Sequence, residues 1–177
     1  MKRSKAVRKA PAKKAAAKKK VQPIPAGYHS VTPYLSIRGA ADAIEFYKKA
    51  FGAKEIMRMP GPDGKIGHAE VQIGDSRLML ADEYEAIGFL SPQARGGTTV
   101  TLHVYVKDVD AMAARATGAG AKVTRPVEDQ FYGDRTGSIE DPFGHVWHLA
   151  THKEDLSMAQ LKKRAAAAAQ DRGSPGA

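Results

Sequence analysis

The apolar positions of residues 31–82 predict a strand, a helix and three further strands, in that order. Residues 31–37 alternate apolar and polar side chains, as a half-buried strand does. A helix is predicted over residues 40–51, where apolar side chains share one face: Ala43, Ile44, Tyr47 and Phe51. Gly52 follows as a helix-ending glycine. The remaining strands are predicted over 54–59, 66–73 and 77–81, separated by turns rich in Gly, Pro and Asp.

A second stretch, residues 100–151, repeats this order. Both stretches open with Val-Thr, at Val31 and Val100, and both reach Gly-Ala-Lys after the helix. Their second halves align without gaps, which places Gly67, Glu70 and Gly74 opposite Gly137, Glu140 and Gly144. The corresponding elements are predicted as a strand over 99–106, a helix over 109–117, a strand over 121–125 and a hairpin folded at 141–144. We infer a duplicated βαβββ unit.

These repeats predict one α+β domain rather than two, since 177 residues are too few for two ordinary domains. Repeat one covers residues 30–82 and repeat two covers residues 99–151, joined by a linker at 88–97. The whole domain is expected to span residues 28–152.

Residues 153–177 are expected to form a C-terminal helix and a frayed tail. Two capping boxes are compatible with its start, Thr151 with Glu154 or Ser157 with Gln160. An alanine run continues the helix, and fraying is expected beyond Gln170.

Composition narrows the setting. The chain has no cysteine, which excludes disulfides and thiolate chemistry and favours a reducing compartment, the cytoplasm. No apolar run approaches the roughly 18 residues of a membrane span, and the basic N-terminus lacks the apolar core of a secretory signal. Membrane partners are therefore not expected.

The net charge of +9 belongs to the N-terminus. Residues 1–20 hold ten of the 28 basic residues and no acid, so the other 18 basic residues face 19 acidic ones. With little apolar surface, residues 1–25 are expected to form a disordered Lys/Ala-rich tail. Such an arm either neutralises the phosphates of a nucleic acid or serves as a solvated extension, and composition leaves both open.

Three segments resemble a known superfamily: TPYLSIRGAADAIEFYKKAFGA, GHAEVQIGDSRLMLADE and EDQFYGDRTGSIEDPFGHVWHLATHKED. Together with the duplicated βαβββ unit, they are similar to the vicinal oxygen chelate superfamily of glyoxalase I, fosfomycin- and bleomycin-resistance proteins and extradiol dioxygenases. Within it, the likeness is to the PhnB-like subgroup. The resemblance implies a glyoxalase/bleomycin-resistance fold, in which the repeats form a curled mixed sheet around a cavity, and it implies a homodimer.

The resemblance also implies a divalent metal acting as a Lewis acid on two substrate oxygens. Its ligand positions, on the first and last strand of each repeat, fall here on Thr32, Met79 (or Leu78, depending on register), Thr101 and His148. Threonine, leucine and methionine are poor ligands for such ions, so the usual metal site is expected to be vacated and no cofactor is expected.

A substitute polar cluster is compatible with strand parity. Residues two apart share a face, so the cavity wall would carry Tyr34, His68, Glu70, His103 and His148. Three His and one Glu suit zinc or iron by type and number. The competing interpretation puts His68 and Glu70 on a solvated face and His103 in the core.

Without metal, the same residues still offer chemistry. His103 and His148 are candidate catalytic acid–base groups, and Glu70 could orient one of them. Ligand-binding candidates are Tyr34, His68, Tyr132 and Arg135, the last as a clamp for a carboxylate or phosphonate unless it forms a surface ion pair. Trp147 points away from His148 by parity and is expected to be structural.

Three functions remain open at this point. The first is a small-molecule enzyme of lyase or dioxygenase type. The second is a module that sequesters a small organic ligand without catalysis, which vacated metal positions favour. The third is a nucleic-acid-associated protein that binds through residues 1–20, with an affinity that falls steeply with salt.

Overall fold

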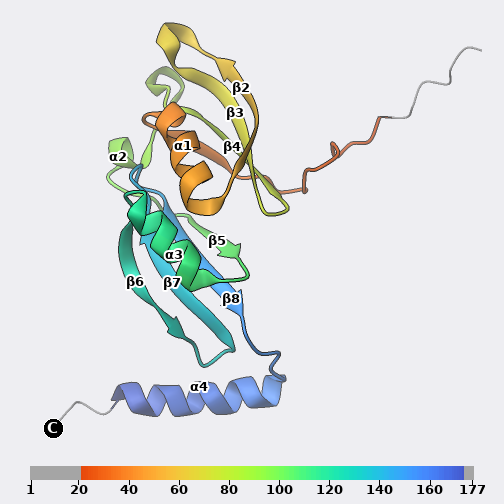
Figure 1. Cartoon of the computed structure of the whole chain (residues 1–177), viewed down its shortest axis with the longest axis vertical. Helices are drawn as coiled ribbons and strands as arrows, with labels where there is room; N and C mark the ends of the chain where they lie inside the picture. The colour runs from red at the N-terminus through yellow and green to blue at the C-terminus, as the bar shows by residue number, and fades with distance from the viewer. Residues whose placement is uncertain (1–20, 174–177) are drawn as a thin grey trace, which may run out of the picture.

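The computed structural model describes residues 21–173 and contains two βαβββ units in succession (Figure 1). The first unit comprises β1 (Tyr34–Ile37), α1 (Ala40–Phe51), β2 (Lys54–Pro60), β3 (Ile66–Ile73) and β4 (Ser76–Asp82). The second comprises β5 (Thr101–Tyr105), α3 (Val109–Gly118), β6 (Lys122–Asp129), β7 (Asp134–Glu140) and β8 (Val146–His152). The duplication predicted from the sequence is therefore present.

Each unit forms its own four-stranded mixed sheet. The strand orders are β1-β4-β3-β2 in the first sheet and β5-β8-β7-β6 in the second, so the two units have the same topology. The pairs β1/β4 and β5/β8 are parallel, and the other pairs are antiparallel. Over residues 21–173 no ladder joins one sheet to the other, so the two sheets do not close into one barrel.

The structure corrects one detail of the repeat. On the ladders, Tyr34 pairs with Met79 and His103 pairs with His148, so these two pairs are equivalent. Glu70 pairs with Met79, but the residue that pairs with His148 from the neighbouring strand is Ser138. Glu70 is thus equivalent to Ser138 and not to Glu140, so the gapless alignment of the second halves is wrong by two residues.

The hairpin turns that follow these positions also differ in length. The hairpin of the first sheet turns over Gly74-Asp75, whereas that of the second turns over residues 141–145. A longer turn shifts the incoming strand along the sequence without changing the ladder. Identical residues at a constant spacing therefore do not mark equivalent positions here.

The edge strands and the linker also differ from the sequence-based boundaries. β1 begins at Tyr34 rather than residue 31, because Pro33 has no N–H to give to a ladder. β6 continues past Arg125 through Pro126, which an edge strand tolerates, with a register shift between Arg125 and Glu128. The linker contains a short helix, α2 (Pro92–Arg95), capped by the Ser91 side chain.

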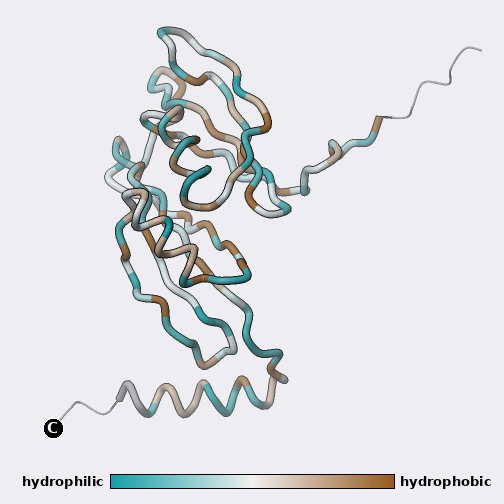
Figure 2. Tube along the Cα trace, viewed as in Figure 1, coloured by the Kyte–Doolittle hydropathy of each residue, from teal (hydrophilic) through white to brown (hydrophobic). Residues whose placement is uncertain are grey.

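One core joins the two units. α1 and α3 pack against each other, and each covers one face of its own sheet (Figure 1). Tyr47 of α1 and Trp147 of β8 are almost fully buried, with ring centroids 5.4 Å apart. Trp147 is structural, as predicted. Figure 2 shows the apolar stretches concentrated in the two units.

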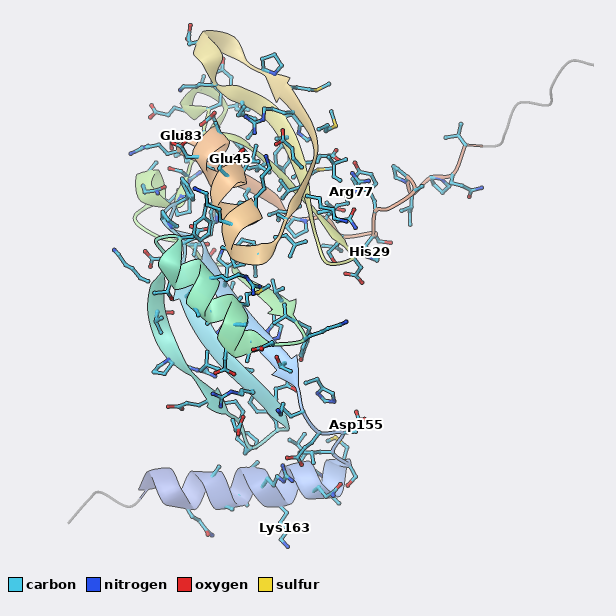
Figure 3. The ribbon with its side chains drawn as sticks, viewed as in Figure 1. His29, Glu45, Arg77, Glu83, Asp155 and Lys163 are labelled. Carbon is cyan, nitrogen blue, oxygen red and sulfur yellow. The ribbon has the colours of Figure 1, made fainter. Side chains whose placement is uncertain are left out.

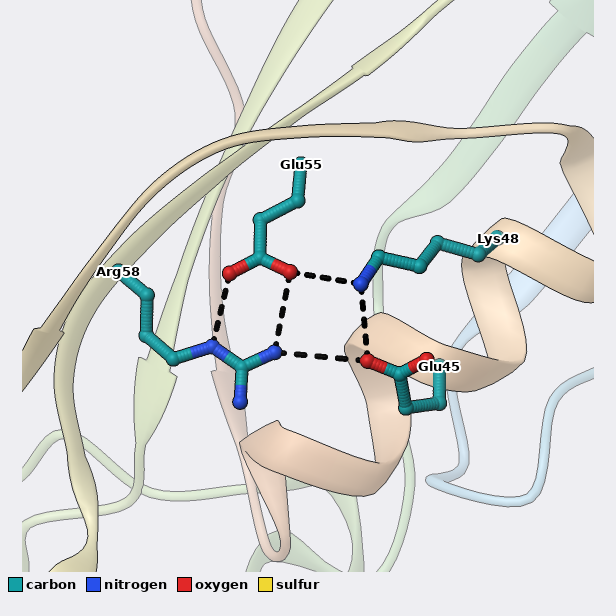
Figure 4. Close-up of polar contacts among 4 residues, drawn as sticks. All are labelled: Glu45, Lys48, Glu55 and Arg58. Carbon is teal, nitrogen blue, oxygen red and sulfur yellow. Dashed lines mark hydrogen bonds and ion pairs between the residues drawn. The ribbon is translucent and has the colours of Figure 1, made fainter.

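Ion pairs hold α1 against β2 at the surface of the first unit. Lys48 contacts Glu45 at 2.9 Å and Glu55 at 2.7 Å, while Arg58 contacts Glu55 at 2.8 Å and Glu45 at 3.5 Å (Figure 4). Exposed pairs of this kind contribute little individually, about 0–1 kcal/mol. The buried apolar face of α1 sets the side of the sheet that the helix covers, and the ion pairs lie at the margin of that contact.

The last helix, α4 (Met158–Gly173), lies beyond the second sheet and apart from both helices of the units (Figure 1). Ser157 and Gln160 form its capping box: the Gln160 amide oxygen accepts from Ser157 N at 2.9 Å, and Ser157 Oγ accepts from Gln160 N at 3.4 Å. The alternative, Thr151, instead bonds the backbone of Val106 and Val109. The helix extends past Gln170, and residues 174–177 lie outside the described residues.

The basic stretch of residues 1–20 also lies outside the described residues, so the predicted disorder of the tail is not tested there. In the part of the chain that the structure covers, every helix is too short or too polar to cross a membrane.

Candidate functional site

Each sheet has one face covered by its helix and one face turned away from it, which we call the open face. In the first sheet, Val71 and Leu80 are fully buried on the helix side. Strand alternation then puts Tyr34, His68, Glu70 and Met79 on the open face. Leu78 belongs to the core, so the register question between Leu78 and Met79 resolves to Met79 at the family's metal position.

A polar cluster centred on Glu70 occupies this open face. Glu70 is only 5% exposed, and its carboxylate accepts hydrogen bonds from the Tyr28 hydroxyl, from Arg77 at 3.2 Å and from His68 at 3.3 Å. The Tyr34 hydroxyl lies 3.0 Å from the other ring nitrogen of His68. The predicted grouping of Tyr34, His68 and Glu70 is therefore present, and the interpretation that put Glu70 on a solvated face is wrong.

Burial disfavours the charged form of Glu70, but the hydrogen bonds from Tyr28 and His68 outweigh it. The pKa of Glu70 is consequently held below its usual value, with further help from the Arg77 charge. Sequence reasoning missed Tyr28 and Arg77. Arg77 stacks over the Tyr28 ring at 4.9 Å, on the side where the N-terminal segment with His29 passes the β3–β4 hairpin (Figure 3).

An apolar pocket of about 410 Å³ adjoins this cluster. Its wall includes Tyr34, Ile66, Ala81, Tyr84, Ile87 and Phe89, and the ring of Phe89 meets that of Tyr34 edge-on at 5.3 Å. Two of the three acidic residues in the wall, Asp82 and Glu83, already have partners. Asp82 accepts from three backbone N–H groups, and Glu83 binds Arg38 and Ser91.

The open face of the second sheet carries a different set of groups. His148 is half-buried; its Nε2 lies 3.3 Å from Ser138 Oγ, and its ring lies 6.0 Å from that of His103. On the outer strand, Arg125 donates to Thr136 Oγ1 at 2.9 Å. Burial lowers the pKa of His148, and the charges of Arg125 and His103 lower it further, which favours a neutral imidazole.

Of the two predicted ligand-binding residues in this unit, only Tyr132 lies near the open face. The Tyr132 hydroxyl is 3.4 Å from Thr136 Oγ1, at the margin of the group. Arg135 instead forms a bidentate ion pair with Asp110, at 2.7 Å for both nitrogens, and contacts Asp129 at 3.2 Å. The structure thus places Arg135 in the surface ion pairs that sequence analysis considered as the alternative.

A larger cavity of about 840 Å³ lies between the β3–β4 hairpin and β5. Arg77 of the first unit and His103 of the second both line it. Of the five side chains proposed as a substitute metal cluster, the structure groups Tyr34, His68 and Glu70 on one sheet and His103 with His148 on the other.

The residues at the family's metal positions do not fit a divalent metal. The Thr32 hydroxyl donates to the His29 carbonyl at 3.3 Å, and Thr101 is an exposed residue at the start of β5. Met79 offers only a thioether, and His148 is the single conventional ligand. Within residues 21–173 no group of three His, Asp or Glu side chains is arranged to hold an ion.

Comparison with known proteins agrees with the fold. An uncharacterised protein of Mycobacterium bovis, Mb0911c, is 43% identical over 136 residues, which cover 75% of this chain and 90% of that protein. The crystal structure of TioX from Micromonospora sp. ML1 matches with a TM-score of 0.56 at 26% identity, covering 73% of this chain and 100% of TioX. The PhnB protein from Bacillus cereus has the same fold, with a TM-score of 0.55 at 18% identity over 70% of this chain and 99% of that one.

The sequence profile of one family covers most of the domain, from residue 29 to residue 149. With the two βαβββ units and the open faces they create, this match shows that the chain belongs to the Glyoxalase/Bleomycin resistance protein/Dioxygenase superfamily.

Proposed function

We propose that this protein binds a small organic molecule on the open faces of its sheets and does so without a metal. The observation that carries the proposal is the 410 Å³ pocket, whose aromatic and aliphatic wall includes Tyr34, the residue whose hydroxyl contacts His68 of the polar cluster. Pockets that bind small molecules combine an apolar wall with a few polar groups in this way. The residues at the family's metal positions include two threonines and a methionine, which are poor ligands for a divalent ion, and this supports binding by side chains alone.

A proton-transfer enzyme is the second candidate, and one observation favours it. The lowered pKa of His148 leaves its imidazole neutral near pH 7, so it can accept a proton from a bound molecule. His103 is its cross-strand neighbour and the second acid–base group. Glu70 lies on the other sheet, so it would orient neither His103 nor His148.

The active form is proposed to be a cytoplasmic homodimer. In one chain the two open faces stay separate, and large apolar side chains such as Tyr34, Met59 and Tyr105 remain exposed on or beside them. Pairing of two chains would cover these surfaces. The lack of cysteine supports a reducing compartment.

Ligand-observed NMR screening of small aromatic and aliphatic compounds tests the binding proposal. Hits are measured on Phe89→Ala, which removes a pocket ring, and on Phe131→Ala, which removes an aromatic outside that pocket. Binding is expected to weaken in the first variant only, and to be the same with a chelator or with added zinc or iron. Equal binding by both variants, or binding that requires metal, would contradict the proposal.

Two further measurements separate the alternatives. Turnover of a hit that disappears in His148→Gln while binding persists would support the enzyme. For the nucleic-acid hypothesis, duplex DNA binding should fall steeply with salt and disappear when residues 1–20 are removed. DNA binding that survives this truncation would refute it.

A further inference from the structure

We propose that the open face of the second sheet is an anion site, which takes a carboxylate, phosphonate or phosphate group of the ligand between Arg125 and the His103–His148 pair. The inference rests on the proposed function, small-molecule binding, and adds the chemical class of the ligand. It does not depend on the pocket of the first sheet, because the groups concerned come from β5 to β8.

The site is a row of residues that runs straight across the sheet. Arg125 pairs with Ser138, Ser138 with His148, and His148 with His103, so each of the four strands contributes one member. Cross-strand partners share a face and lie about 4.5–5.5 Å apart at Cβ. The row therefore presents a guanidinium, a hydroxyl and two imidazoles on one side of one rigid sheet, and all of these groups can donate hydrogen bonds.

Among the described residues Arg125 has no ion pair with a carboxylate, which it shares with Arg95 and Arg115. Within residues 21–173, five others form ion pairs with carboxylates: Arg38, Arg58, Arg77, Arg135 and Arg164. Arg125 only donates one hydrogen bond to Thr136, which holds its guanidinium over the sheet. A guanidinium fixed in this way retains donors for a carboxylate or phosphonate, which it binds in a forked geometry.

The acidic residues of the same face do not neutralise the row. Asp134 accepts from Tyr105 at 2.9 Å and lies 2.7 Å from a ring nitrogen of His152. Glu140 and Glu128 lie opposite Lys122 and Thr136 on the backbone ladder, and among the described residues neither carboxylate forms an ion pair or hydrogen bond with a member of the row. The centre of the face therefore has positive character, and His103 connects it to the 840 Å³ cavity, which gives a ligand room.

The equivalent row of the first sheet shows that this character is specific to the second. There the ladder positions hold Met57, Glu70, Met79 and Tyr34 in place of Arg125, Ser138, His148 and His103. The same backbone thus carries an apolar row with a buried acid in one repeat and a basic, hydrogen-bond-donating row in the other. The fold alone does not require the basic row.

Inorganic phosphate and phenylphosphonate are suitable probes, with benzyl alcohol as an uncharged comparison. Each is titrated into the full chain while the imidazole Cε1–H signals of His103 and His148 are followed by NMR. We expect both anions to shift these signals saturably and benzyl alcohol to leave them in place. Arg125→Gln should weaken phosphate binding roughly ten- to a hundredfold, the usual effect of losing a charge-assisted hydrogen bond. Arg135→Gln, the matched control, should bind as the parent does.

The pH dependence gives a second readout. An anion stabilises the charged form of His148, so binding takes up a proton and phosphate affinity should rise as the pH falls toward the pKa of that residue. Tyr105, Asp134, Glu128, Lys122, Glu140 and His152 also face this side, so the comparison is made against His148→Gln, in which the rise should be smaller.

The outcomes distinguish this inference from the function on which it rests. If phosphate moves neither histidine, or if Arg125→Gln and Arg135→Gln bind it equally well, the anion site is overturned, even where Phe89-dependent binding of neutral compounds persists. If anion binding depends on Arg125 while no compound depends on Phe89, the anion site stands and the pocket proposal falls.

Discussion

Replacing Asp141 should test the contact that ties the two repeats together. Asp141 is 3% exposed and accepts four hydrogen bonds, all of 2.9 Å. One carboxyl oxygen caps the β7–β8 turn through the N–H groups of Phe143 and His145. The other accepts from the Tyr47 hydroxyl of the first unit and the Trp147 indole of the second.

The magnitude follows from the donors that would be left buried. An unpaired buried polar group costs about 1–3 kcal/mol, and removing one member of a buried charged contact costs about 3–5 kcal/mol. Asp141→Ala should lower the free energy of unfolding by about 3–5 kcal/mol, since partial relaxation and water offset a simple sum. Asp141→Asn keeps the turn cap but points an NH₂ group at the tyrosine and the indole. The hydroxyl can rotate to accept and the indole cannot, so about 1–3 kcal/mol is expected.

Urea unfolding followed by far-UV circular dichroism measures these differences. Asp75→Ala, at an exposed turn, is the control and should stay within about 0.5 kcal/mol of the parent. A loss below about 1 kcal/mol in Asp141→Ala would refute the reasoning, because it would mean that the cost of burying the carboxyl group cancels its four bonds.

Three other outcomes can be measured directly. The hydrogen bonds from Arg38 and Ser91 lower the pKa of Glu83 to about 2, below its unfolded value of about 4.3. The stabilisation by the charged carboxylate is therefore complete above the unfolded pKa and is lost as the pH falls toward the folded one. The stability advantage of the parent over Glu83→Gln should shrink between about pH 5 and pH 2 in urea titrations. The pKa of His148 should rise in Arg125→Gln and stay unchanged in Arg135→Gln, as followed by NMR, because the charge of Arg125 lowers this pKa and that of Arg135 does not contribute; a rise of similar size in both variants would contradict this. Gly137→Ala should destabilise the protein by about 1–3 kcal/mol, because its Cβ would lie 2.7 Å from Val127 Cγ2, whereas Gly118→Ala, with open space at that position of α3, should not, as measured by thermal unfolding.

Where one element has one clear period, the sequence predicts it well. The predicted bounds of α1 and β3 coincide with those observed, and Gly52 ends α1 in the left-handed conformation. The repeat, and with it the topology, follows because two stretches of the chain show such elements in the same order. The equivalence of Glu70 and Ser138 could not be read in this way, because the two residues differ in type and identical residues nearby suggested another alignment.

The candidate site was predictable only in part. The alternation of side chains along a strand correctly predicted that Tyr34, His68 and Glu70 share a face, since β1 and β3 are regular where these residues lie. Strand alternation could not place Arg125, because β6 has a register shift on either side of it. Tyr28 could not be found at all: it lies in an irregular segment, and its contact with Glu70 depends on how that segment crosses the hairpin.

The two open faces carry different side chains although their backbones have the same topology. Both rows sit on the same ladder positions of the same topology, so each strand offers the same Cβ direction in both repeats. In the first sheet the buried Glu70 is neutralised locally by Arg77, which leaves Tyr34, Met57 and Met79 as an apolar surface. In the second no acid offsets Arg125. A ligand suited to both faces would carry an apolar body and an anionic group, and neither face alone would discriminate such a molecule from a plain hydrocarbon or a plain anion. Since the two faces stay separate in one chain, selectivity for such a ligand is the property that pairing of two chains would add.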